Sequence, residues 1–129
     1  MRNEPLVLVL TILTATTMLL FLPFVHGLMP VFASEVYEVG PAGLGLLMSV
    51  VGIGSIFGTV LVASIGDIDN KGRAIVAALA LTIAGVVAFS RIPAISPAIL
   101  ALMLLSGAFT ALITINSATI QSVVPDKLR

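Results

Sequence analysis

The sequence predicts an all-α membrane protein with four transmembrane helices, because of its composition and of where its charges fall. The chain is 59% hydrophobic and only 9% charged, whereas an ordinary soluble domain carries about 25% charged residues. Residues 5–34, 39–66, 74–90 and 92–125 contain no Asp, Glu, Lys or Arg. A spanning helix needs about 20 predominantly apolar residues, so each of these runs can supply one crossing of a bilayer.

We expect the four helices, in chain order, near residues 6–29, 42–65, 74–90 and 97–120. The first is too long for the apolar core of a signal peptide and lacks a clean cleavage site, and Pro23 should kink it. The second and fourth have ample length, and the third is only just long enough. No soluble domain is expected beside them, so residues 1–129 are read as one membrane unit.

The basic residues predict the orientation, since Lys and Arg in short loops are retained in the cytoplasm. Only Arg91 lies in the connection between the third and fourth helices. The others lie at the termini or in the 66–73 turn: Arg2, Lys71, Arg73, Lys127 and Arg129. We therefore expect an integral protein of a plasma membrane, such as the bacterial inner membrane, with both termini in the cytoplasm.

The polar composition disfavours several classes of protein. The net charge is zero and no basic patch suggests a nucleic-acid partner. The chain has no Cys and one His, which leaves little for a metal site. The carboxylates all fall in the predicted loops or ends, so no acid–base pair is expected within the membrane. We expect no enzyme activity, no cofactor and no bound metal; the lipid bilayer is the first expected partner.

The turn between the second and third helices carries a motif. The run "DNKGR" resembles the D-R-x-G-R core of the loop motif of the major facilitator superfamily, with matches at Asp69, Gly72 and Arg73. Asn70 stands where the family usually has Arg. The resemblance implies that this loop gates the inward side; a plain helix-capping turn that also sets the topology is the alternative. In that alternative Gly72 supplies flexibility, and Asp69 or Asn70 caps the next helix.

Two longer stretches carry the same resemblance. Gly43 to Asp67 is similar to the eighth helix of the drug and siderophore exporters of this superfamily, and Asn116 to Arg129 is similar to the end of their tenth. The resemblance implies helices seven to ten of the C-terminal half of a twelve-helix transporter, and hence a fragment. It also implies as partners the remaining helices of that transporter and a small-molecule substrate that the sequence does not identify.

Small residues on the second helix predict close packing. One stripe recurs every three or four positions and consists of Gly45, Ser49, Gly52, Ser55, Thr59, Ala63 and Gly66. Gly54 and Gly58 form a GxxxG pair on the opposite side. Because small residues let helix backbones approach closely in lipid, we expect neighbours on both faces. A branched side chain at Gly52 or Gly58 should separate them.

Three polar residues stand out within apolar runs. Asn116 and Gln121 cannot easily satisfy themselves on their own helix, so we expect them at a cavity or at a polar contact between helices. His26 is the only ionisable side chain deep in an apolar run and is a functional candidate for that reason. A hydrogen-bonded histidine at the helix end is the plainer interpretation.

The function predicted from these observations is secondary active transport of small molecules by alternating access, with export as the expected direction. One alternative is a self-contained four-helix multidrug transporter, although proton-coupled members of that class need a carboxylate in the membrane. Another is a membrane assembly subunit that transports nothing. The second alternative explains the small-residue packing but leaves the loop motif unexplained.

Overall fold

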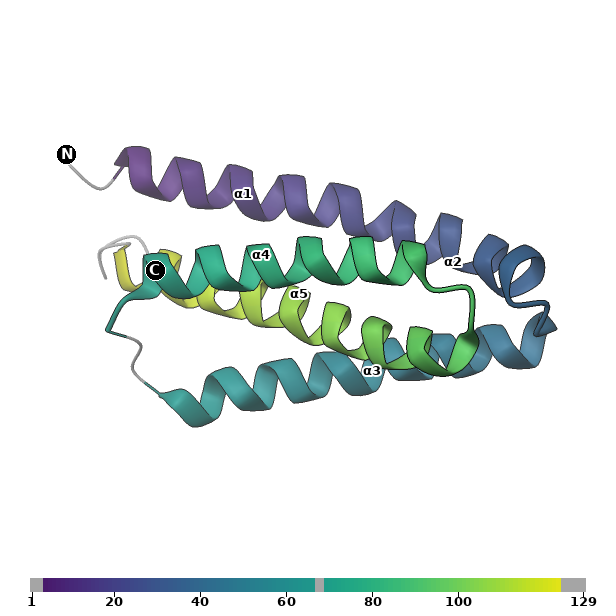
Figure 1. The fold of residues 1–129 in the computed structure, drawn as a ribbon. Helices are drawn as coiled ribbons and strands as arrows, with labels where there is room; N and C mark the ends of the chain where they lie inside the picture. The colour runs from purple at the N-terminus through teal and green to yellow at the C-terminus, as the bar shows by residue number, and fades with distance from the viewer. Residues whose placement is uncertain (1–3, 67–68, 124–129) are drawn as a thin grey trace.

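The computed structural model describes residues 4–66 and 69–123, which form four long antiparallel helical segments (Figure 1). The first segment is continuous but irregular and comprises α1 (Glu4–Pro23), the π-helical turn η1 (Phe24–Leu28), α2 (Met29–Val31) and the π-helical turn η2 (Phe32–Val36). The other three segments are α3 (Gly40–Ile65), α4 (Lys71–Arg91) and α5 (Ile95–Val123). All four are long and apolar enough to cross a membrane, so the predicted all-α class and the four spans are confirmed.

The first segment differs most from its predicted bounds, since it runs to Val36 and not to residue 29. Pro23 and Pro30 each lack an N–H donor, and a π-helical turn follows shortly after each of them. In a π-helical turn each N–H donates to the carbonyl five residues earlier, one residue further than in an α-helix. In η2, for example, the N–H of Tyr37 donates to the carbonyl of Phe32 at 2.9 Å. The expected disturbance after Pro23 is therefore a widened turn, and the helix continues through the segment predicted as loop.

The turn between α3 and α4 also differs from expectation. Gly66 caps the C-terminal end of α3 with a φ of 68°, which suits glycine, while Gly72 lies within the first turn of α4. The prediction that Gly72 is the flexible point of the turn is wrong, since Gly72 lies within α4. Of Asp69 and Asn70, the two residues expected to cap α4, Asn70 occupies the N-cap position but makes no side-chain capping bond.

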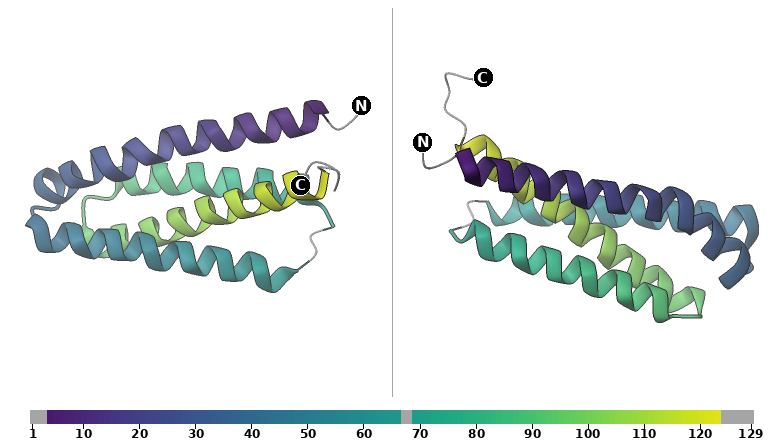
Figure 2. Two further views of the ribbon diagram at one scale, coloured as in Figure 1. Left: turned by 180° about the vertical axis from the view of Figure 1, so that it is seen from behind. Right: turned by 90° about the horizontal axis from the view of Figure 1, so that it is seen from above.

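Helix α5 is the centre of the bundle and has the largest buried share of the four spans. It packs against α3, α4 and, less extensively, α1, and it runs obliquely between α1 and α4 (Figure 2). Its buried residues contribute to two apolar clusters. One cluster, at the end of the bundle where α4 leads into α5, surrounds Phe89, which is fully buried against the rings of Phe24, Phe32 and Tyr37.

The second cluster is smaller and joins α1 and α4 to α5 through Leu10, Ile75 and Leu112. Among the described residues of α1, Leu10 is the only one that is buried. At the opposite end of the bundle the hydroxyl of Tyr37 donates to the carbonyl of Ile92 at 3.1 Å and ties two connections together. Burial raises the pKa of the Tyr37 phenol, and the neutral hydroxyl is the form that donates this bond.

Candidate functional site

The main polar contact between helices is made by Asn116 on α5. Its side chain is 1% exposed, and its Nδ2 donates to the carbonyl oxygen of Leu10 at 2.8 Å. The same Nδ2 contacts the hydroxyl oxygen of Thr14, which itself donates to the Leu10 carbonyl at 3.0 Å. The sequence predicted Asn116 either at a cavity or at a polar contact between helices, and the structure places it at a contact between helices.

The other half of the Asn116 amide has no partner. Its Oδ1 is buried and accepts no hydrogen bond within the described residues. A buried carbonyl group without a donor costs about 1–3 kcal/mol. The contact therefore links α1 to α5 through the amide nitrogen. The Oδ1 atom remains able to accept a hydrogen bond from a donor such as a water molecule or a ligand.

The structure does not bring the other two predicted polar residues to this contact. Gln121 is exposed on the last part of α5, five positions from Asn116. His26 is exposed in η1, and Thr14 lies twelve positions before it. That separation is about 18 Å along a helix that rises 1.5 Å per residue. His26 thus lies toward the α2 end of the first segment and apart from Asn116.

The residues of the loop motif lie on the surface at the opposite end from His26. Asp69, Gly72 and Arg73 are all exposed, and neither charged side chain forms an ion pair with the part of the chain that the structure describes. The neighbouring Lys71 reaches α5 through a long hydrogen bond of 3.5 Å from its Nζ to the hydroxyl of Ser122. This weak bond is the motif's link to the central helix.

Gly54 and Gly58 make the closest approach between helices. A Cβ atom at Gly58 would lie within 3.0 Å of three backbone atoms of Gly107 on α5. A Cβ at Gly107 would in turn lie 3.0 Å from the carbonyl oxygen of Gly54. Sequence reasoning missed Gly107, because its role depends on the register of α3 against α5, although its small size is the usual signal for such contacts.

The predicted second packing face of α3 has no neighbour among the described residues. A Cβ atom at Gly45 or at Gly52 would meet no other atom within 4 Å, and most of the stripe to which they belong is exposed. Within the described residues, a side chain at Gly52 meets no neighbouring helix, so its effect in a full-length protein stays a prediction. The close helix–helix contact of α3 is made by its other face, with Gly54 and Gly58.

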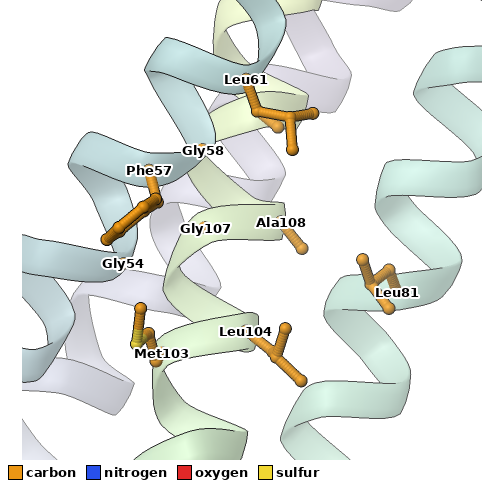
Figure 3. Close-up of a pocket in the computed structure, with 10 residues that line it drawn as sticks. Gly54, Phe57, Gly58, Leu61, Leu81, Met103, Leu104, Gly107 and Ala108 are labelled. Carbon is orange, nitrogen blue, oxygen red and sulfur yellow. The ribbon is translucent and has the colours of Figure 1, made fainter.

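Two apolar cavities lie beside α5. One, of about 300 Å³, lies between α3, α4 and α5, and the glycines of the contact form part of its wall. Figure 3 shows Leu81 of α4 directed toward Leu104 and Ala108 of α5. The other, of about 390 Å³, lies between α1, α4 and α5 and includes three threonines. Neither is lined by a charged residue from the described part of the chain.

No chemistry-bearing cluster accompanies these cavities. Within residues 4–66 and 69–123, no group of three His, Asp or Glu side chains could hold a metal ion. Comparisons of the chain with known protein families, with curated proteins and with solved structures find no match. The buried amide, the glycine contact and the two cavities are thus the features on which a function must be argued.

Proposed function

We propose that the chain is part of a secondary active transporter of the major facilitator type, which exports small amphiphilic molecules by alternating access. In this proposal it supplies helices seven to ten, in a plasma membrane such as the bacterial inner membrane, with both termini in the cytoplasm. The loop of Asp69, Gly72 and Arg73 contributes to closing the inward side. The remaining helices and the substrate are its partners.

The observation that carries the proposal is the buried Asn116 amide on the central helix. Polar groups within a membrane are costly, so those that are present mark packing contacts or pathways. The Nδ2 of Asn116 donates a hydrogen bond to α1, whereas its Oδ1 accepts none within the described residues. A polar contact that is only half satisfied is one that can be exchanged as helices move, which suits alternating access better than a permanently fixed scaffold.

The irregular first segment gives further support. Turns of π-helix within a continuous helix occur frequently at functional positions. Here two such turns, η1 and η2, interrupt the segment that Asn116 contacts. They provide points at which the first segment can bend, and the Asn116 contact at Leu10 and Thr14 lies before both of them in the chain.

An assembly subunit that transports nothing is the second candidate. It is favoured by the open face of α3 at Gly45 and Gly52, which offers a packing surface to another protein. A self-contained four-helix transporter has less support, because the carboxylates of the described residues lie at helix ends or in connections. Glu35, in η2, is exposed at the outer end of its span.

The proposal is tested by reading the coding sequence on both sides of this segment and assaying its product. We expect an open frame with further apolar segments, including a Gly-Arg pair and two more helices after Arg129. Bacteria that lack their own exporters and express that product should accumulate less of a fluorescent amphiphile, and Asn116→Ala should raise the accumulation. Stop codons on both sides, or a product without effect on accumulation, would refute the proposal.

A further inference from the structure

The cavity between α1, α4 and α5 is open at the surface of the bundle, since several of its lining residues, among them Leu20, Ile83 and Val87, are exposed. It has a volume of about 390 Å³, within the range of about 300–1,000 Å³ typical of small-molecule sites. Its wall on the first segment runs from Leu13 to Phe24, which is the middle part of the span Glu4–Val36. The cavity therefore lies near the middle of this candidate span, beside α5.

We propose that this cavity is a binding site for an uncharged aromatic molecule that carries one hydrogen-bond donor and enters from the bilayer. The site goes beyond the proposed transport function, and binding there does not depend on transport. It lies between α1 and α4, whereas Asn116 is not among the residues that line it. Three features of its lining specify the ligand.

The first feature is the absence of charge. Every described residue that lines the cavity is apolar or is a threonine. Moving an ionised group into such a site without a partner costs far more than moving a neutral polar group. An anion or cation of the right size should therefore be rejected, while its uncharged analogue is accepted.

The second feature is a set of aromatic rings. Phe21 of α1 and Phe109 of α5 both line the cavity, and their rings are stacked with centroids 3.7 Å apart and planes inclined by 13°. Phe24 lies 6.3 Å from Phe21 in a tilted arrangement. Aromatic pairs stabilise by about 0.5–1.5 kcal/mol beyond their burial, so this wall favours a ligand with an aromatic ring over an alkyl chain.

The third feature is the state of the threonine hydroxyls. Thr17 donates to the carbonyl of Leu13 at 2.6 Å and Thr82 donates to that of Ala78 at 2.8 Å. Each hydroxyl has one hydrogen to donate, so what remains on its oxygen is acceptor capacity. The buried Thr82 hydroxyl can thus accept a bond from an N–H or O–H of the ligand, which fixes its polar end against α4.

The test uses two probes with the same aromatic skeleton. N-phenyl-1-naphthylamine is uncharged and has one N–H donor; 8-anilinonaphthalene-1-sulfonate is its sulfonated, anionic counterpart. Both fluoresce more strongly in apolar sites. They are titrated onto residues 1–129 in lipid nanodiscs, with empty nanodiscs as the reference. We expect saturable fluorescence from the neutral probe, and at least tenfold weaker binding of the anion.

Two variants with matched controls locate the binding. Thr16→Phe fills the cavity from α1 and should weaken the neutral probe about tenfold, while Thr11→Phe makes the same change at an exposed α1 position outside the cavity and should have no effect. Thr82→Val keeps the size of the side chain but removes the acceptor, and should weaken binding several-fold. Thr59→Val, on the exposed face of α3, is its control. Circular dichroism confirms that each variant is folded.

The outcomes separate cleanly. Saturable binding that Thr16→Phe weakens and Thr11→Phe does not supports the site. The proposal is overturned by non-saturable binding, by equal binding of the anion at this cavity, or by indifference to both cavity variants. It is also overturned if mass spectrometry finds a phospholipid that the neutral probe does not displace and that Thr16→Phe releases. Binding without transport would refute only the transport function.

Discussion

A single added carbon at Gly58 should loosen the bundle, whereas the same carbon at Gly52 should not. The structure places any Cβ at Gly58 within 3.0 Å of the Gly107 carbonyl oxygen, carbonyl carbon and Cα. These are backbone atoms of a helix, so they cannot move aside as the end of a flexible side chain could. Relief requires α3 and α5 to separate at their closest point.

The magnitude follows from two opposing effects. Overpacking costs about 1–3 kcal/mol, and we expect the upper part of that range because backbone atoms are the obstacle. Replacing Gly by Ala within a helix is intrinsically favourable by about 0.8–1 kcal/mol. Gly58→Ala should therefore lower the free energy of unfolding by about 1–2 kcal/mol. Gly52→Ala, which meets nothing within 4 Å, should leave it unchanged or raise it slightly.

The assay is unfolding of the purified chain in mixed micelles by increasing SDS, followed by circular dichroism. The comparison of the two alanine variants cancels their common helix propensity and leaves the packing effect. Gly54→Ala should behave like Gly58→Ala, since its Cβ would meet Ser106 and the backbone of Met103. Equal effects at Gly52 and Gly58, or no effect at Gly58, would refute the assignment of this contact.

Two further predictions concern orientation and the buried amide. Since the chain has no Cys, single cysteines can be introduced at Tyr37 and Asn70. A membrane-impermeant reagent added outside intact cells should label Tyr37→Cys only. Labelling of Asn70→Cys only would show that the topology is the reverse of the predicted one. Asn116→Leu should destabilise the chain by about 1 kcal/mol or less in the SDS assay, because bonds between helices in membranes average about 0.6 kcal/mol and the change also removes the unpaired Oδ1. Asn116→Asp should cost more, since a buried carboxyl group loses the Nδ2 donor; a larger loss with Leu than with Asp would contradict this account of the contact.

The number of spans could be predicted from the sequence because long uncharged runs have few alternatives to crossing a bilayer. The end of the first span could not, since Pro30 and Glu35 read as a loop while the backbone widens into η2 and stays helical. A proline signals a missing donor but does not indicate whether the helix stops or becomes a π-turn. The positive φ at Gly66 and not at Gly72 reflects the same limit, because either glycine could have taken it.

The sequence could predict which residues stand out at the candidate site, but not which residues on other helices they contact. Asn116 stands out in an apolar run, yet its partners, Leu10 and Thr14, lie more than one hundred positions away. The GxxxG pair on α3 was visible, whereas the choice of Gly107 as its partner depends on helix register. The cavity of the three threonines had no sequence signal, because its walls come from three helices and each threonine satisfies its donor locally or lies exposed.

The central claim is that these four helices are one part of a transporter, and flux through the isolated chain tests it most directly. A cavity formed between two halves of a transporter presents only one wall in each half, so the chain alone lacks a second body against which to rock. Residues 1–129 in proteoliposomes under a proton gradient should therefore show no flux of a fluorescent amphiphile above that of empty vesicles. Saturable flux that Asn116→Ala abolishes would contradict the claim and establish a self-contained four-helix transporter.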